Sequence, residues 1–165
     1  MEFKREIIIN APAEKVWEVL GTQFGRVCDW ASGVNKSSAS AHSAANTDYT
    51  NRACDTTSGK IKEVVNVFDP QRHELEYEVI EGFPFFVKTG KNNWKLTAVG
   101  SKTKVNMNLQ IVTQGFVGKI MRPMMKMQMN KIADNAVDDL KVYVETGKPS
   151  ARKAKELAKM TRKAA

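Results

Sequence analysis

The sequence predicts an α+β protein in which a curved antiparallel sheet wraps around one long C-terminal helix. Residues 115–145 carry apolar side chains every three or four positions, the period of an amphipathic helix packed on a core. Residues 34–113 lose that period and alternate polar with apolar side chains between turn signals rich in glycine and proline. A length of 165 residues with 42% hydrophobic content suits a single core. Strands followed by a segregated helix are typical of α+β folds.

The elements are expected in the order strand, two helices, six strands and one long helix. Three consecutive isoleucines predict the first strand, at residues 2–10. Pro12 suits the first position of the next helix, and residues 24–30 favour a second short one. The other six strands are expected at residues 34–42, 48–55, 60–68, 74–81, 85–98 and 103–113. The sheet would therefore contain seven strands.

The long helix carries one conflict and one unusual composition. Pro123 lacks an N–H group, which predicts a kink or a short first segment ending near Arg122. Five of the eight methionines lie between Met121 and Met129, which indicates either adaptable core packing or a soft wall facing a variable apolar ligand. The expected core stripe consists of Val117, Met121, Met124, Met125, Ile132, Ala136, Leu140, Tyr143 and Val144.

Charge is concentrated at the C-terminus. The formal net charge is +8, and residues 147–165 hold seven basic side chains against the single acidic Glu156. The sequence thus predicts a nearly neutral folded domain at residues 1–146 and a basic tail at residues 147–165. That tail either attracts an anionic partner, such as RNA, a ribosome or a membrane surface, or forms a solvated, frayed helix.

Localisation and redox signals favour the cytoplasm. The chain starts with charged residues instead of an apolar run, and no stretch approaches the roughly 20 apolar residues of a membrane span. The two cysteines, Cys28 and Cys54, form neither a disulfide framework nor a zinc pattern. We expect both to be ordinary thiols.

Several stretches carry a resemblance to a known superfamily. They are IIINAPAEKVWEVL, CDWASGV, EYEVIEGFPFF, NNWKLTAVGSKTKV and DDLKVYVE. From about residue 2 to residue 145 the chain resembles the START-like, or SRPBCC, superfamily, nearest its polyketide cyclase/dehydrase branch. The resemblance implies a helix-grip fold with a cavity between the sheet and the C-terminal helix. Members include lipid and hormone binders, cyclases, quinone-binding proteins and chaperone activators, without a universal catalytic residue. Trp30 resembles the superfamily's tryptophan near the cavity mouth, although a plug between helix and sheet is the alternative.

The period of two along the strands predicts which side chains face the inside. Tyr77 shares the apolar face of its strand, and a turn centred on Gly100-Ser101 places Trp94 opposite Met107. The same face, extended back along the strand, would point Phe86 and Lys88 inward. Met124, on the expected helix stripe, would face them from the other side of the cavity.

One charged pair is expected inside. A hairpin turn at Thr57-Ser58 sets Arg52 against Glu63, on a face shared with branched apolar residues. Buried charges persist when paired, and such groups tend to mark functional pockets. A β-bulge would instead turn both into water. The candidate ligand-binding residues are therefore Trp30, Arg52, Glu63, Tyr77, Phe86, Lys88, Trp94, Met107 and Met124.

Recognisable catalytic motifs are missing. The two histidines, His42 and His73, belong to no metal-binding pair, and nucleotide-binding glycine patterns and DNA-binding motifs are absent, so we expect no metal and no cofactor. The leading hypothesis is binding of a small hydrophobic molecule such as a lipid, isoprenoid, polyketide or aromatic. The alternatives are a cyclase or dehydratase using Glu63, Lys88 or Tyr77 for proton transfer, and an interaction module built on the basic tail. The sequence assigns no catalytic residue.

Overall fold

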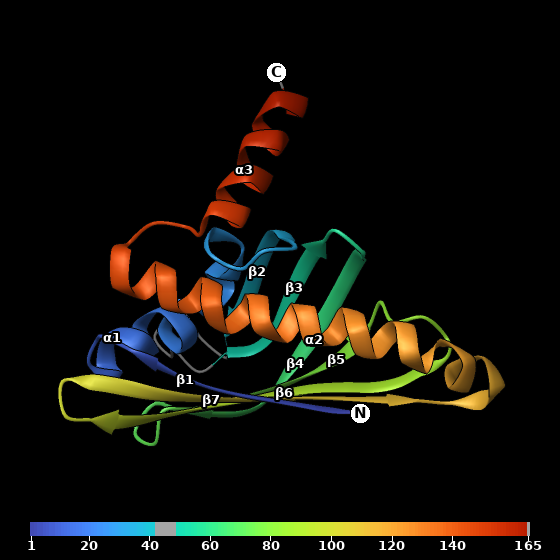
Figure 1. The fold of residues 1–165 in the computed structure, drawn as a ribbon, viewed down its shortest axis with the longest axis horizontal. Helices are drawn as coiled ribbons and strands as arrows, with labels where there is room; N and C mark the ends of the chain where they lie inside the picture. The colour runs from blue at the N-terminus through green and yellow to red at the C-terminus, as the bar shows by residue number, and fades with distance from the viewer. Residues whose placement is uncertain (42–48, 165) are drawn as a thin grey trace.

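The computed structural model describes residues 1–41 and 49–164 (Figure 1). His42 and the ends of two predicted strands lie outside the described residues. Seven strands form one antiparallel sheet in the order β1-β7-β6-β5-β4-β3-β2. Their bounds are β1 Glu2–Ile9, β2 Val34–Ala41, β3 Tyr49–Thr56, β4 Gly59–Asp69, β5 Glu74–Glu81, β6 Val87–Val99 and β7 Lys102–Thr113. The predicted seven-stranded antiparallel sheet and α+β class are confirmed.

The helices lie on one side of this sheet. The short helical segment after β1 consists of α1 Ala13–Trp17 and a wider π-type turn, η1 Glu18–Thr22. A 3₁₀ segment, η2 Phe24–Asp29, follows it and leads into β2. The long helix is α2 Gly115–Thr146, and a further helix, α3 Ala151–Ala164, projects from the body (Figure 1). In Figure 1 the sheet curls around α2, with β1, β6 and β7 below it and β2 and β3 rising beside it.

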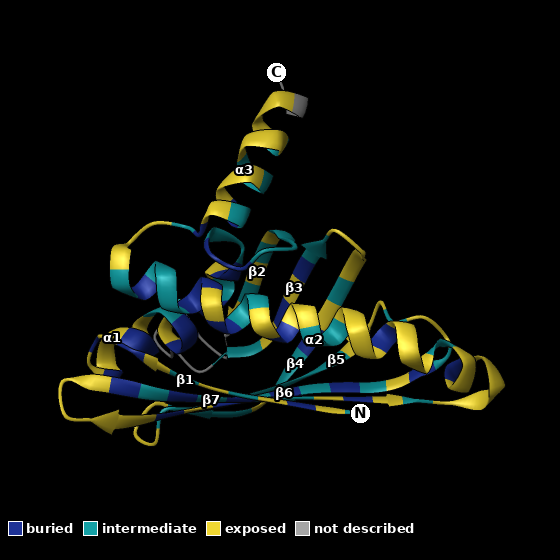
Figure 2. Cartoon of the chain, in the orientation of Figure 1, coloured by how far each residue is buried: buried dark blue, intermediate teal, exposed yellow. Residues whose placement is uncertain are grey.

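The end of α2 near α1 carries most of its core contacts. Ala133, Val137, Leu140 and Val144 are almost completely buried there, and their spacing of three and four follows the helical period. Toward the start of α2 only Gly118 and Met125 are buried. The first turns are therefore mostly exposed, which Figure 2 shows in yellow.

Of the two outcomes expected at Pro123, the short first segment ending near Arg122 is excluded, because the helix continues through Pro123 as a single element. The expected core stripe was wrong at Val117, Met124 and Ile132, which are all exposed. Consecutive helix positions differ by about 100°, so in the pair Met124-Met125 only one side chain can face the sheet. Met125 is the buried one, and the sequence alone offered no way to choose between two adjacent methionines.

A compact junction joins α2 to α3. Gly147 ends α2 in the left-handed conformation that glycine adopts without strain, and its N–H donates to the carbonyl of Tyr143. Ser150 then caps α3, because its hydroxyl accepts the backbone N–H of Lys153. Lys153 is itself fully buried and donates its Nζ to the carbonyl of Val34 at 2.6 Å. The predicted basic tail is thus a helix whose first turn is anchored on the body.

Candidate functional site

A buried ion pair lies in the β3–β4 hairpin. Arg52 and Glu63 are direct partners in the antiparallel register, as predicted, and the Nε of Arg52 donates to Glu63 Oε2 at 2.6 Å. Only 5% of Arg52 and 4% of Glu63 is exposed. The hairpin turn at Thr57-Ser58 leaves no bulge between the turn and this pair. The alternative in which both side chains face water is therefore excluded.

Aromatic rings cover the guanidinium group of Arg52. The group lies 3.9 Å from the ring centre of Phe24 and 4.8 Å from that of Tyr77, both within the range of cation–π attraction. Its Nη1 also donates to the carbonyl of Phe24 at 3.2 Å. Burial opposes the charge on Arg52, but attraction by Glu63, Tyr77 and Cys54 together with the hydrogen bond to Glu63 outweighs it and raises the pKa of Arg52. The arginine therefore stays charged inside the protein.

Cys54 lies beside this pair. Its sulfur is 3.7 Å from Glu63 Oε2, and the residue is buried. Burial raises the pKa of the Cys54 thiol to about 12, against the lowering effect of Arg52. A thiol with that pKa carries its proton at neutral pH, so it acts as a weak donor and not as a nucleophile.

A second group of polar atoms continues from Tyr77 along the inner face of the sheet. The Tyr77 hydroxyl accepts Asn92 Nδ2 at 3.1 Å and Trp94 Nε1 at 3.4 Å. Burial raises the pKa of Tyr77, which keeps its hydroxyl protonated at neutral pH. Arg52, Glu63, Tyr77 and Asn92 therefore form a connected set across β3 to β6, which we call the polar row.

One atom of the polar row has no partner. Asn92 is 9% exposed, and its Oδ1 accepts no hydrogen bond from any described residue. Buried amide oxygens are almost always paired, because an unpaired one loses its hydrogen bonds to water without replacement. Asn92 thus holds an acceptor that a donor group of a bound molecule could satisfy.

The remaining predicted residues are divided between the inner face and the surface. Trp94 and Met107 are register partners and both are buried, as expected. Phe86 is partly buried against the core. Trp30 is buried at the end of η2, and no hydrogen bond or aromatic pair of the described residues links it to the polar row.

The predicted inward orientation is wrong for Lys88 and Met124. A bulge between Val87 and Thr89 inverts the alternation of β6, so that Val87 is buried and Lys88 is exposed. Met124 is 43% exposed for the helical reason given above. Neither side chain joins the polar row.

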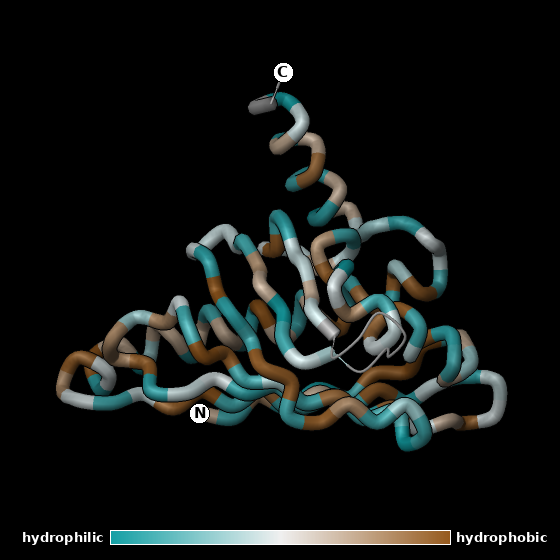
Figure 3. The backbone as a smooth tube through the Cα atoms, turned by 180° about the vertical axis from the view of Figure 1, so that it is seen from behind, coloured by the Kyte–Doolittle hydropathy of each residue, from teal (hydrophilic) through white to brown (hydrophobic). Residues whose placement is uncertain are grey.

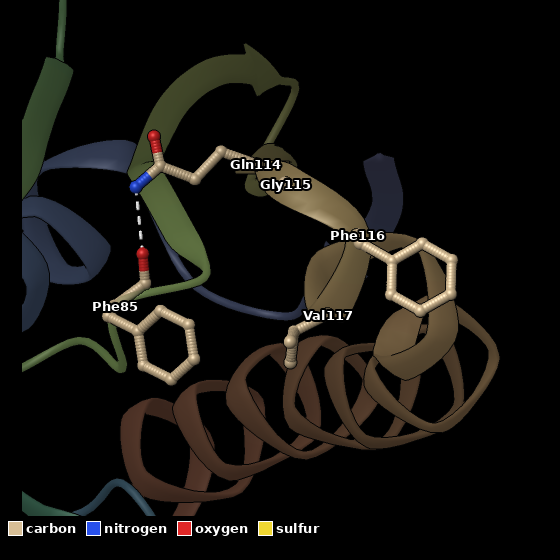
Figure 4. Close-up of a pocket in the computed structure, with 5 residues that line it drawn as sticks. All are labelled: Phe85, Gln114, Gly115, Phe116 and Val117. Carbon is tan, nitrogen blue, oxygen red and sulfur yellow. Dashed lines mark hydrogen bonds between the residues drawn. The ribbon is translucent and has the colours of Figure 1, made fainter.

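The loop between β5 and β6 covers the inner face at the start of α2. A side chain at Gly90 would collide with the ring of Phe83, because a Cβ there would lie 2.4 Å from it. The loop is fastened to the helix by Gln114, whose side-chain amide donates to the carbonyl of Phe85 at 2.7 Å (Figure 4). Beside this contact is an open hollow of about 400 Å³, lined by Phe85, Gln114, Gly115, Phe116 and Val117.

A comparison with family models identifies the fold's family. Residues 1–145 match the model described as polyketide cyclase / dehydrase and lipid transport. The chain belongs to this family. The match covers the sheet and nearly all of α2 and ends before α3. A search of curated proteins found no match.

Solved structures with the same fold include an aromatase/cyclase, a START superfamily protein and a norcoclaurine synthase. The Zhui aromatase/cyclase from Streptomyces sp. R1128 is 17% identical with a TM-score of 0.68, covering 91% of this chain and 99% of its own. The START superfamily protein from Mycobacterium smegmatis is 12% identical with a TM-score of 0.64, and the alignment covers 82% of this chain and 93% of its own. A Thalictrum norcoclaurine synthase is 12% identical with a TM-score of 0.67, and the alignment covers 87% of this chain and 93% of its own. The predicted START-like, helix-grip fold is confirmed.

Together the family and its fold support hydrophobic ligand binding or cyclase activity in general. In the described part of the chain, no helix combines the length and the apolar character needed to span a bilayer.

Three elements of the site were not predicted. No motif or charge pattern marks Gln114 or Phe116 in the sequence. The unpaired oxygen of Asn92 could not be predicted either, because it depends on how four strands are arranged.

Proposed function

We propose that this protein binds a small, largely apolar molecule between the inner face of the sheet and α2. The observation that carries the proposal is the polar row, with the unpaired Asn92 Oδ1 at its end. A polar cluster among apolar side chains is typical of sites that orient an apolar ligand through a few polar atoms. The ligand would be a lipid, isoprenoid, polyketide or aromatic that carries at least one donor group, such as a hydroxyl.

The chemistry of the polar row favours binding over catalysis. Tyr77 and Cys54 both have raised pKa values and hold their protons at neutral pH, so neither is a ready base. Glu63 is already bonded to Arg52, and Lys88 lies on the surface. A cyclase or dehydratase remains the second candidate because the family includes cyclases and the Tyr77 hydroxyl could donate a proton.

Native mass spectrometry of the protein purified from its own source tests the proposal first. We expect one apolar molecule per chain, released and identified after denaturation. A titration with the neutral dye N-phenyl-1-naphthylamine, which has an apolar body and one N–H donor, supplies a defined probe. Saturable binding of one dye per chain is expected, and Asn92→Leu should weaken it about tenfold because one hydrogen bond is lost.

A matched control distinguishes this loss from a general effect of replacing an asparagine. Asn66 lies on the exposed side of β4, so Asn66→Leu should leave dye binding unchanged. If the protein carries no apolar molecule and the dye does not saturate it, the proposal is refuted. Turnover of a bound polyketide that survives in Asn92→Leu but ends in Tyr77→Phe would favour the cyclase instead.

The proposal also includes the remaining expectations on location and on the tail. The cytoplasmic location indicated by the sequence would give the protein access to apolar metabolites made there. The exposed basic side chains of α3, such as Lys155 and Lys159, support an anionic partner for that helix. Charge reversal of both residues would remove such a partner without changing dye binding.

A further inference from the structure

A group of exposed apolar side chains covers the start of α2 and the neighbouring loop. We call it the tip patch, and it consists of Phe85, Phe116, Ile120, Met124 and Met127. Phe85 and Phe116 line the same hollow (Figure 4) and are 76% and 77% exposed. Phe116, Ile120, Met124 and Met127 recur every three or four residues and thus share one side of the helix. Seen from behind, this end of the chain includes brown, hydrophobic segments (Figure 3).

The tip patch is separate from the core. In the same turns of α2, Gly118 and Met125 are the buried residues, on the side of the helix away from Phe116. The first part of α2 therefore has two apolar sides, one against the sheet and one against water. Contiguous exposed apolar side chains with polar residues around them tend to mark interaction sites.

The charges on the part of α2 that carries the tip patch all have the same sign. Residues 115–131 contain Lys119, Arg122, Lys126 and Lys131 and no acidic residue. All four side chains are exposed, and none forms an ion pair with a described residue. A surface that combines exposed aromatic and aliphatic groups with unpaired cations complements the interface of an anionic bilayer.

We propose that the tip patch docks on anionic lipid membranes. The rings of Phe85 and Phe116 enter the interfacial layer together with Ile120, while Lys119, Arg122 and Lys126 contact lipid phosphates. A second copy of the chain is a poorer occupant, because two facing tip patches would bring cations together without any acidic group between them. The docking goes beyond small-molecule binding and does not depend on it.

Sedimentation with lipid vesicles tests this proposal on the full chain. The vesicles contain either phosphatidylcholine alone or phosphatidylcholine and phosphatidylglycerol in a ratio of about 7:3. We expect binding to the anionic vesicles and at least tenfold weaker binding to the neutral ones. Raising the salt from about 0.1 M to about 0.5 M should weaken the anionic binding, because the Debye length shrinks from about 10 Å to a few ångströms.

Paired variants separate the apolar and the charged contributions. Phe116→Ser with Ile120→Ser, and Lys119→Glu with Arg122→Glu, should each reduce binding at least tenfold. Matched controls lie at the β6–β7 turn, where Val99 and Lys102 are also exposed; Val99→Ser with Lys102→Glu should bind as the wild type does. Lys155→Glu with Lys159→Glu in α3 should retain most of the binding.

Four results would overturn the proposal. The wild-type chain would fail to sediment with the anionic vesicles, or both tip variants would bind as strongly as the wild type. Loss of binding in the α3 variant alone would assign the membrane contact to α3. A dimer in analytical ultracentrifugation that Phe116→Ser abolishes would identify a second copy as the occupant.

Discussion

The two ends of α2 both carry apolar side chains, but these are buried at one end and exposed at the other. Toward its C-terminal end, Leu140 and Val144 are buried between the sheet and the short N-terminal helices. At its start, Phe116 and Ile120 are equally apolar but lie in water. Hydrophobicity alone therefore does not distinguish a core position from a surface one in this helix. The difference lies in what the sheet offers opposite each turn.

This contrast extends to the polar groups. The base of the molecule, by which we mean residues 132–146 of α2 with α1, η1 and η2, contains a buried carboxylate with several partners. Asp139 accepts the backbone N–H of Ser32 at 2.8 Å, Arg152 Nε at 2.7 Å and the hydroxyl of Ser150. Near the tip, the hydrogen bond of the Gln114 side chain to the loop is exposed to solvent. We therefore expect substitutions at the base to cost stability and substitutions at the tip to change binding.

The largest effect is expected at the ion pair next to η2. Glu63→Ala leaves the charge of Arg52 buried and unpaired, which should lower the free energy of unfolding by about 3–5 kcal/mol. Urea denaturation measures this loss. Replacing both partners, in Arg52→Leu with Glu63→Leu, should cost less than Glu63→Ala alone. The exposed pair Lys62–Glu81, which joins β4 to β5, is the control, and Glu81→Ala should cost less than about 1 kcal/mol.

A direct comparison of the two ends of α2 comes next. Leu140→Ala removes a completely buried side chain and should cost about 2–5 kcal/mol. Ile120→Ala should change the free energy of unfolding by no more than about 0.5 kcal/mol, because its side chain is exposed. Equal losses in urea denaturation would show that the tip is packed as tightly as the base.

Asp139 should have an intermediate effect. Asp139→Ala leaves the Ser32 N–H and the Ser150 hydroxyl without their acceptor, which should cost about 1–3 kcal/mol. The adjacent Asp138 is exposed, and Arg152 is its only side-chain hydrogen-bond or ion-pair partner among the described residues. Asp138→Ala is therefore the matched control, and a similar loss in both variants would contradict the role assigned to Asp139.

At neutral pH the smallest effect is expected at Cys54, because its contribution changes only as the pH rises. The folded thiol of Cys54 has a pKa of about 12 against an ordinary value of 9.0, so the unfolded chain loses this proton first as the pH rises. The free energy of unfolding should thus decrease between pH 9 and pH 12, by at most about 1.4 kcal/mol per pH unit. Cys54→Ala should lack this component. Parallel curves for variant and wild type from pH 8 to pH 11 would argue against the raised pKa.

The strand pattern predicted much of the site, and its failures have identifiable causes. Arg52 and Glu63 were paired correctly because their hairpin has a short turn without a bulge. Lys88 was misplaced because one extra residue near Val87 inverts the alternation, and nothing local in the sequence marks it. Asp139 could not be predicted as a buried group, because its partner Ser32 is 107 residues away and its partner Ser150 reaches it only through the turn after α2.

The anchoring of α3 has a consequence for how the C-terminus becomes ordered. A helix of about fourteen residues is marginal in water, since its first turn is unfavourable to form and each later residue adds little. Here that first turn is held in advance by Ser150, Lys153 and the contact of Glu156 with the N–H of Gly33. The turn therefore serves as a template, and the remaining residues need only to extend it. The formation of α3 therefore depends on the folded domain.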